Sequence, residues 1–292
     1  MVESTADANK ETQEENKDIP ECVMNDTVRA FEPTLDDVFI ILPSGDYQRM
    51  LFAGHELRER EQTHMNDFRE WLKARELTLP DGYDDANMVV LRFLQGLKWD
   101  YQAAYNEITA HAQWKKDLVI SGYETFKEDL ELGVLYGCRR DIKMHPILII
   151  NVRRMIDSKI NLDRLVAMAD FFLNYVIEHA MIPGKIEGWT SIFDLKDVGV
   201  TEIPKDRIQG LVRNMSKNYR GRLYRFYATD VTFVVRQLWQ LAHRFVDEFT
   251  NKKLQIFGND YQEAVAELIA KENLEERYGG TFPDKKDNFF PP

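Results

Sequence analysis

Cysteine is scarce in this chain of 292 residues, which contains only Cys22 and Cys138. Two cysteines exclude a disulfide scaffold and a cysteine-rich metal site, and they indicate a reducing, cytosolic setting. Long apolar runs are also missing, since no stretch approaches the ~18 apolar residues that a membrane span needs. The first ten residues, MVESTADANK, lack a basic segment followed by an apolar one, so we expect no secretory signal. The sequence therefore predicts a cytoplasmic protein.

Motifs of phosphate-binding loops and of common catalytic sites are absent as well. The sequence contains no G-x-G-x-x-G, G-x-x-x-x-G-K-[ST], G-x-S-x-G, H-E-x-x-H or C-x-x-C. Its six histidines are scattered, with no pair at metal-ligand spacing. His179 beside Glu178 could suggest acid–base chemistry, but such chemistry needs a positioned partner that the sequence does not reveal. We therefore expect a protein that is not an enzyme and that uses no cofactor or metal.

Charge is unevenly distributed along the chain, whose formal net charge is −11. Residues 1–45 hold eleven acids and three bases, and residues 1–54 are predicted to be an acidic, partly disordered extension. Residues 205–225 hold seven bases and one acid, a net charge of +6. An acidic protein is a poor general nucleic-acid binder, whereas a basic segment of this kind can meet an anionic surface. We expect no nucleic-acid partner.

The hydrophobic pattern changes once along the chain. From 55 to 122 it is helical, with Asp100 as a candidate N-cap, which predicts an all-helical subdomain. Beyond it, strand-like runs alternate with helical stretches, which predicts an α/β layer with a largely parallel sheet. A further strand-like run at 38–42 precedes the turn signal Pro43-Ser44-Gly45. The expected strands of the sheet are 134–139, 147–152, 189–194, 223–229 and 254–257, and the expected helices are 162–182, 204–217, 231–249 and 260–270.

Two of these helices are unusually apolar. On the helix expected at 162–182, Asp170, Asn174 and Glu178 form one narrow polar stripe. The apolar remainder of its surface must be covered by other parts of the protein, as in a core helix that packs on the sheet. On the helix expected at 231–249, apolar residues span an arc of roughly 160°, which is wider than the ~100° that a packed surface helix needs. That helix is either unusually well buried, or it lines a cavity on one flank and packs on the other. Its apolar residues are Val231, Val234, Val235, Leu238, Trp239, Leu241, Ala242, Phe245 and Val246.

Six segments resemble, in order and spacing, motifs of the CRAL-TRIO lipid-binding family, typified by fungal phosphatidylinositol/phosphatidylcholine transfer proteins. They are LRFLQGLKWD at 91–100, DIKMHPILII at 141–150, SIFDLK at 191–196, NYRGRL at 218–223, LQIFG at 254–258 and LEERYGG at 274–280. Leu97 stands where the first motif usually has arginine, and Arg220 where the fourth usually has proline. The chain is identified as a divergent member, whose ligand can differ from the family's best-known one.

The resemblance implies a CRAL-TRIO-type mixed, largely parallel five-stranded sheet, flanked by helices, that floors an apolar lipid pocket. A long helix closes that pocket in the family, and here the apolar arc after Asp230 would be this gate. The tails of a phospholipid hold about 30 methylene and methyl groups, and exposing each to water costs about 0.8 kcal/mol. A carrier must therefore enclose the tails and open only at a membrane, in a conformational step that makes and breaks no bond.

The resemblance also places Lys98, Glu187 and Arg225 at the positions that phosphatidylinositol-binding members use for the headgroup. A cation suits the phosphate, and a carboxylate accepts hydrogen bonds from neighbouring hydroxyls. The ordinary alternative for each residue is a surface charge.

The basic segment has two interpretations, a solvated helix face or a surface that docks on an anionic leaflet. The candidates for docking are Arg213, Lys217, Arg220 and Arg222.

The predicted organisation has four parts: an extension at 1–54, a helical subdomain at 55–122, a CRAL-TRIO lipid-binding domain at 123–282 and a tail at 283–292. The predicted function is to bind a phospholipid, with phosphatidylinositol as first candidate, and to exchange it between membranes as a monomeric protein that associates with them peripherally. Two alternatives remain open. One is a carrier or sensor of another hydrophobic ligand, of the tocopherol, retinoid or sterol type, and the other is an adaptor with a vestigial pocket.

Overall fold

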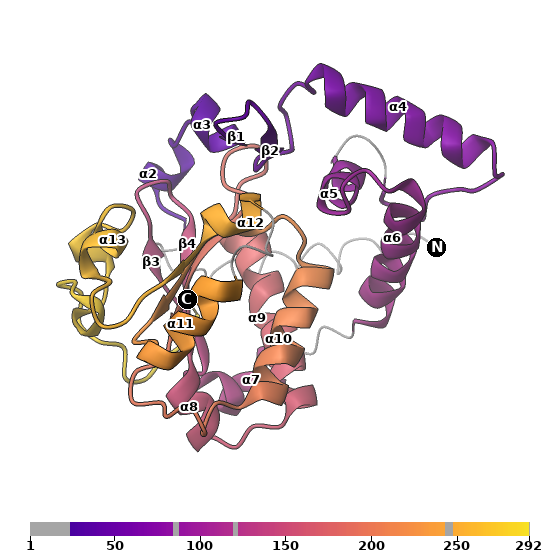
Figure 1. The fold of residues 1–292 in the computed structure, drawn as a ribbon. Coiled ribbons are helices and arrows are strands. Elements are labelled where there is room, and N and C mark those ends of the chain that lie inside the picture. The colour runs from indigo at the N-terminus through magenta and orange to yellow at the C-terminus, as the bar shows by residue number, and fades with distance from the viewer. Residues whose placement is uncertain (1–23, 84–87, 119–121, 243–247, 292) are drawn as a thin grey trace, which may run out of the picture.

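The computed structural model describes residues 24–83, 88–118, 122–242 and 248–291. A five-stranded sheet lies between helices, and a separate group of helices stands to one side of it (Figure 1).

The sheet follows the order β3-β4-β5-β6-β7, in which β3 and β4 are antiparallel and all other neighbours are parallel. All six residues of β4 are buried, as expected of a strand that is covered on both faces. The predicted mixed, largely parallel sheet is confirmed, and the strand limits differ from the expected ones by at most one residue. The strands are β3 (Leu135–Arg140), β4 (Pro146–Asn151), β5 (Trp189–Asp194), β6 (Leu223–Thr229) and β7 (Leu254–Ile256).

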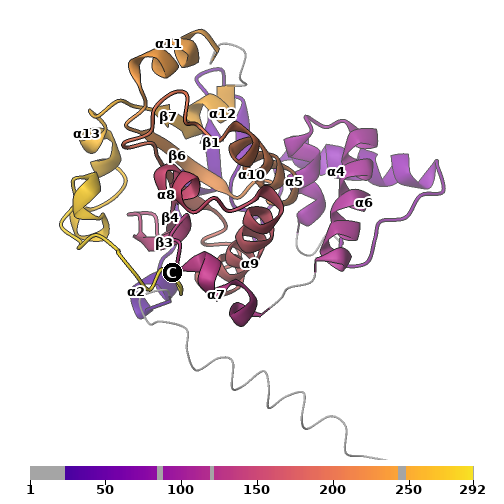
Figure 2. The same ribbon diagram turned by 90° about the horizontal axis from the view of Figure 1, so that it is seen from below.

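The two faces of the sheet are covered by different parts of the chain (Figure 2). One face packs against a helical layer whose longest members are α9 and α10. The other face packs against the C-terminal part of the chain, drawn in yellow. The first layer consists of α7 (Tyr123–Leu130), α8 (Val152–Asp157), α9 (Leu162–Ala180) and α10 (Lys205–Asn218), and the second contains α13 (Gln262–Ala266) and the short 3-10 turns at Lys271–Asn273 and Glu276–Tyr278.

Helix α9 is the core helix that its sequence predicts. Its buried apolar face, which includes Leu165, Phe172 and Leu173, belongs to the same core cluster as Trp189 of β5. Two residues of its polar stripe turn inward, because the Tyr219 hydroxyl donates to the Asp170 carboxylate (2.9 Å) and accepts from the Asn174 amide (3.0 Å), whereas Glu178 is exposed. The stripe therefore joins α9 to the end of α10.

The helical group consists of α4 (Glu59–Lys73), α5 (Val89–Gly96) and α6 (Tyr101–Asp117), which lie to the right of α10 in Figure 1. These helices share an apolar cluster of their own. The Asp100 side chain accepts a hydrogen bond from the Ala103 amide (2.9 Å), so the predicted N-cap of α6 is confirmed.

The chain before α4 forms α2 (Asp26–Arg29), α3 (Leu35–Val38) and a hairpin of β1 (Phe39–Ile41) and β2 (Tyr47–Arg49). The hairpin confirms the predicted turn, where Gly45 has φ of +85°, a conformation that favours glycine. Lys185 pairs with Glu32, and Lys143 with Asp37, so this part of the chain is attached to the body by ion pairs. Residues 1–22, which are predicted to be disordered, lie outside the described residues, which begin at 24.

Two expected helices differ from the structure. The helix expected at 231–249 begins only at Phe233 of α11 (Phe233–Ala242), and α12 (Glu248–Lys253) precedes β7. Residues 243–247, between these two ranges, lie outside the described residues. Asp230 has φ of +56°, and the Val231 amide donates to the Phe257 carbonyl (2.9 Å), so Val231 continues the pairing with the sheet instead of entering the helix. The helix expected at 260–270 is α-helical only over α13.

Candidate functional site

The sheet carries a half-covered apolar surface where β5, β6 and β7 run side by side. Phe193 and Phe226 lie on the face that also packs α9 and α10, with ring centroids 5.7 Å apart, and Leu254 is paired with Phe226 in register. All three are only half-buried, although β5 and β6 are interior strands with neighbours on both sides. Their exposure must therefore be through the face of the sheet, which leaves an apolar floor available.

Helix α11 follows β6 directly and is anchored at the edge of this floor. Arg236 packs on Gly258, which comes just after β7, and its guanidinium lies 3.6 Å from the carboxylate of Asp260. Val234 is 57% exposed and its neighbour Phe233 is 66% exposed, whereas Val231 is only 4% exposed. Phe233 was not among the predicted gate residues, and its apolar side chain within the helix expected at 231–249 is the sequence signal that could have indicated it.

Of the remaining predicted gate residues, only Val235 has a described side chain. Val235 is half-buried on α11. Phe245 and the side chains of Leu238, Trp239, Leu241 and Ala242 lie outside the described part of the structure. The hollow expected beneath the gate stays a prediction.

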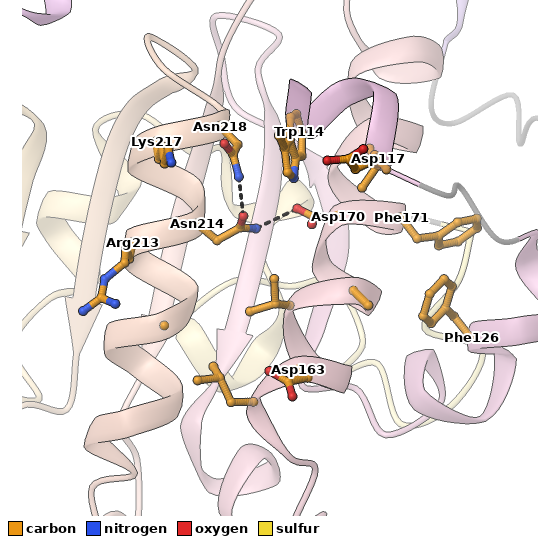
Figure 3. Close-up of a pocket in the computed structure, with 15 residues that line it drawn as sticks. Trp114, Asp117, Phe126, Asp163, Asp170, Phe171, Arg213, Asn214, Lys217 and Asn218 are labelled. Atoms are coloured by element: carbon orange, nitrogen blue, oxygen red, sulfur yellow. Dashed lines mark hydrogen bonds between the residues drawn. The ribbon is translucent and has the colours of Figure 1, made fainter. Parts of the chain in front are cut away.

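A separate apolar cavity of about 560 Å³ lies between α9 and α10, with α6 and α7 at its rim (Figure 3). This volume is within the roughly 300–1,000 Å³ of small-molecule sites. Trp114, Phe126 and Phe171 supply its aromatic lining, and no residue of α11 contributes to it.

Polar groups cross this cavity as a chain of hydrogen bonds. Figure 3 shows Asn214 of α10 reaching to Asp170 of α9 (2.6 Å), while the Asn218 amide donates to Asn214 (2.7 Å). Burial raises the pKa of Asp170, although its hydrogen bonds to Asn214 and Tyr219 act in the opposite direction. Because this carboxylate is already satisfied, the chain of bonds fixes α9 against α10.

Glu187, the predicted headgroup carboxylate, is buried and fully engaged by the protein itself. It accepts hydrogen bonds from the backbone amides of Phe52 (3.1 Å), Ala53 (2.8 Å) and Gly184 (2.8 Å). It also forms an ion pair with Arg92, which belongs to the LRFL segment at the start of the resemblance. Sequence reasoning missed Arg92, because a partner 95 positions away leaves no local signal.

The other two members of the predicted triplet lie in different surroundings. Arg225 donates to the carbonyl of Lys252 in α12 and lies 5.8 Å from the ring centroid of Tyr224. Lys98 is exposed just after α5, with φ of +53°. In the described structure, no hydrogen bond or ion pair joins any two of Lys98, Glu187 and Arg225.

The four predicted docking residues divide into two pairs. Arg213 and Lys217 are exposed on α10. Arg220 lies 3.5 Å from the carboxylate of Glu107, and Arg222 donates to the Glu187 carbonyl (2.9 Å), so both point into the protein. Only the first pair is presented to solvent.

Within the described ranges, no helix combines the length and the apolar composition of a membrane span, and no three potential metal-ligating acidic, histidine or cysteine side chains gather.

The chain resembles known proteins along most of its length. Residues 130–280 match the CRAL/TRIO domain. The chain is 27% identical over 246 residues to the phosphatidylinositol/phosphatidylcholine transfer protein SFH4 of Arabidopsis thaliana, covering 76% of this chain and 39% of that protein. It is 26% identical over 249 residues to the Sec14 cytosolic factor of Schizosaccharomyces pombe, covering 78% and 84%.

The fold also resembles the crystal structure of Sfh5. The TM-score is 0.59 at 18% identity, over 80% of this chain and 91% of that one. A domain match across more than half of the chain, together with the observed sheet, is decisive: the chain belongs to the CRAL/TRIO domain family.

Proposed function

We propose that this protein is a lipid carrier that encloses the tails of a phospholipid against the floor formed by β5, β6 and β7. The half-buried Phe193 and Phe226 on interior strands are the observation that carries this proposal. Fully burying a phenylalanine is worth about 1.5–3 kcal/mol, and completing the burial of a half-buried one recovers part of this, so a half-covered apolar floor favours an apolar occupant. Relatives whose names include phosphatidylinositol/phosphatidylcholine transfer support the same class of ligand.

The gating step would be a movement of α11. Its apolar side chains would close over the tails in water, and the exposed Phe233 and Val234 would enter the acyl region of a bilayer when the helix opens. The membrane then replaces the apolar contacts that opening removes, so release and uptake occur there and no bond is made or broken. Such a protein is a carrier and not an enzyme.

The headgroup site of this proposal uses Lys98 and Arg225 as cations for the phosphate. Glu187 would act with them mainly by holding Arg92 and Arg222 in place, since its oxygens already accept protein donors. Leu97 offers no charge where the family motif usually has arginine, which keeps a hydrophobic ligand of the tocopherol, retinoid or sterol type as the second candidate.

Extraction of the purified full chain with organic solvent, followed by mass spectrometry, tests the ligand. We expect stoichiometric phospholipid, with phosphatidylinositol or phosphatidylcholine dominant. A co-purified isoprenoid or sterol would favour the second candidate. Protein that carries no lipid, and that moves none between vesicles, would refute the carrier and leave an adaptor.

A variant at the floor tests where the tails lie. Phe226→Glu puts a charge on the apolar face, and we expect it to lower bound lipid by about tenfold or more, given the 1.5–3 kcal/mol that burial of this side chain is worth. Val212→Glu, on an exposed apolar residue of α10, is the matched control. Circular dichroism verifies that both variants fold. Equal lipid contents in folded samples of the two variants would place the tails elsewhere.

We also propose that the protein is cytosolic and docks peripherally on anionic membranes. Arg213 and Lys217 on α10 would supply about 1 kcal/mol each near an anionic surface. Sedimentation with vesicles that contain phosphatidylserine should fall for the double variant Arg213→Gln/Lys217→Gln, and for Phe233→Asp. Binding that depends neither on phosphatidylserine nor on these residues would reject this docking surface.

A further inference from the structure

At the joint between the helical group and the sheet domain lies a partly open cavity of about 140 Å³ that the lipid proposal does not use. α5 and α6 line it on one side, and α9, the end of α10 and the turn before β6 line it on the other. Arg92, Lys115, Arg220 and Arg222 contribute four positive charges, and none of the residues that line it is acidic. A small cavity with this lining favours an anion.

The buried arginines share too few carboxylates. The Glu187 carboxylate pairs with Arg92, while Arg222 reaches only the Glu187 carbonyl (2.9 Å) and the sulfur of Met181 (3.6 Å). Burial, and then the charge of Arg222, lower the pKa of Arg92 to about 9. Burial also lowers the pKa of Arg222. Both shifts mean that positive charge at this joint is incompletely compensated.

Arg220 is the least satisfied of the three. Its Nε is buried without a hydrogen-bond partner, and its closest carboxylate, Glu107, lies 3.5 Å away. Its guanidinium stands 5.7 Å from the ring centroid of Phe93, and burial lowers its pKa. A partly buried cation whose closest carboxylate is not hydrogen-bonded to it is costly, and a bound anion would offset its charge.

Charge decides which anion fits. Four cations offset by the carboxylates of Glu187 and Glu107 leave a local charge of about +2, and His111 adds none, because burial lowers its pKa to about 4. A phosphate monoester carries about −1.5 to −2 at neutral pH. The volume corresponds to about four or five waters at ~30 Å³ each, enough for one phosphate group. Guanidinium groups match phosphate oxygens in geometry as well as in charge.

We propose that this cavity, which we call the joint cavity, binds a phosphate dianion through Arg92, Arg220 and Arg222, with Lys115 at its exposed edge. The occupant is either free phosphate or the terminal phosphomonoester of a larger ligand such as a lipid headgroup. Because the ligand bridges the helical group and the sheet domain, its binding stabilises their joint. This site is distinct from the apolar floor at β5 to β7.

Titration calorimetry and thermal unfolding of the full chain in sodium phosphate, against sodium chloride at matched ionic strength, test the site. We expect saturable binding and a higher melting temperature in phosphate. Arg220→Gln should weaken binding by about tenfold or more, because hydrogen bonds to charged groups are worth about 1.5–3 kcal/mol. Arg220→Lys should restore part of it. Lys115→Gln, on an exposed side chain, should weaken binding by only about twofold to fivefold.

Lys205→Gln, which removes the same charge from an exposed position on α10, is the control and should bind phosphate like the parent. Equal melting temperatures in the two salts, or a folded Arg220→Gln that responds to phosphate like the control, would overturn the proposal. These measurements contain no lipid, so a negative result would refute the phosphate site without bearing on the carrier proposal. The carrier proposal is tested separately, by lipid extraction.

Vesicles of phosphatidylcholine with or without phosphatidic acid, a phosphomonoester lipid, identify the source of the phosphate. Binding that requires phosphatidic acid, that inorganic phosphate competes away and that Arg220→Gln loses would assign the joint cavity to a lipid headgroup. If vesicle binding depends neither on phosphatidic acid nor on Arg220, while the protein still binds phosphate in solution, the joint cavity would be assigned to a free phosphate compound.

Discussion

Replacing Glu187 by alanine separates a structural role for this carboxylate from a direct role in ligand binding. Its two oxygens accept three backbone hydrogen bonds and pair with Arg92, so they tie residues 52–53 and α5 to the chain before β5. If this is its main role, Glu187→Ala loses stability whether or not a lipid is present.

The magnitude follows from the burial of both partners, whose side chains are 9% and 4% exposed for Arg92 and Glu187. Breaking a buried ion pair by removing one member costs about 3–5 kcal/mol, because the remaining charge is left unpaired. At roughly 2–4 °C per kcal/mol for a large domain, the melting temperature should fall by roughly 6–20 °C. The double variant Arg92→Leu/Glu187→Leu should recover much of this loss, since apolar replacement of both members of a buried pair is often neutral.

Thermal and urea unfolding of the lipid-free protein measure the effect. Glu178→Ala is the control, because that side chain is 75% exposed and should change stability by less than about 0.5 kcal/mol. If Glu187→Ala unfolds at the same temperature and urea concentration as the parent but loses its lipid, the structural reasoning is wrong and the carboxylate binds the ligand directly.

Two further predictions concern the C-terminal part of the chain and the helical layer. Burial raises the pKa of Glu275 to about 7 in the folded protein. The protonated carboxyl therefore favours the folded state below the unfolded-state pKa of about 4.5, and this stabilisation is lost as the pH rises to about 7. Glu275→Gln should therefore stabilise the protein by about 1–3 kcal/mol above pH 7 and little at pH 4. Urea unfolding at both pH values measures this difference. An equal gain in stability from the exposed Glu276→Gln would contradict the prediction. A methyl group on Gly280 would lie 1.8 Å from the Leu274 carbonyl oxygen, which is fixed backbone, whereas one on Gly210 would meet only the flexible end of a leucine. Gly280→Ala should cost about 3 kcal/mol or more and Gly210→Ala less than about 1 kcal/mol in the same assay, and the reverse order would refute this steric argument.

Much of the fold could be predicted because its signals are local. The apolar runs that became β4 and β5 are flanked by turns, and Asp100 caps its helix through an amide only three positions away. The helix predicted from 231 was placed too early because Val231 is apolar enough to continue the helical pattern. Its pairing with Phe257 depends on the neighbouring strand, which periodicity does not represent.

The candidate site could be predicted only in part, because residue type does not reveal a partner. Glu187 and Arg225 were selected because the family resemblance places them at headgroup positions, yet the first is held by Arg92 and the second by the carbonyl of Lys252. The basic segment likewise shows its charge in the sequence, but not that Arg220 and Arg222 turn inward while Arg213 and Lys217 face solvent.

The sequence by itself determined the order of helices and strands, the parallel sheet and the family, since periodicity, caps and motif spacing act over a few residues and are written along the chain. The tertiary structure alone decided which charges are buried together, which apolar strand face stays uncovered and where the joint cavity lies. Those features arise from contacts between segments more than a hundred positions apart, and the free energy of a buried charge depends on the neighbours that folding brings to it.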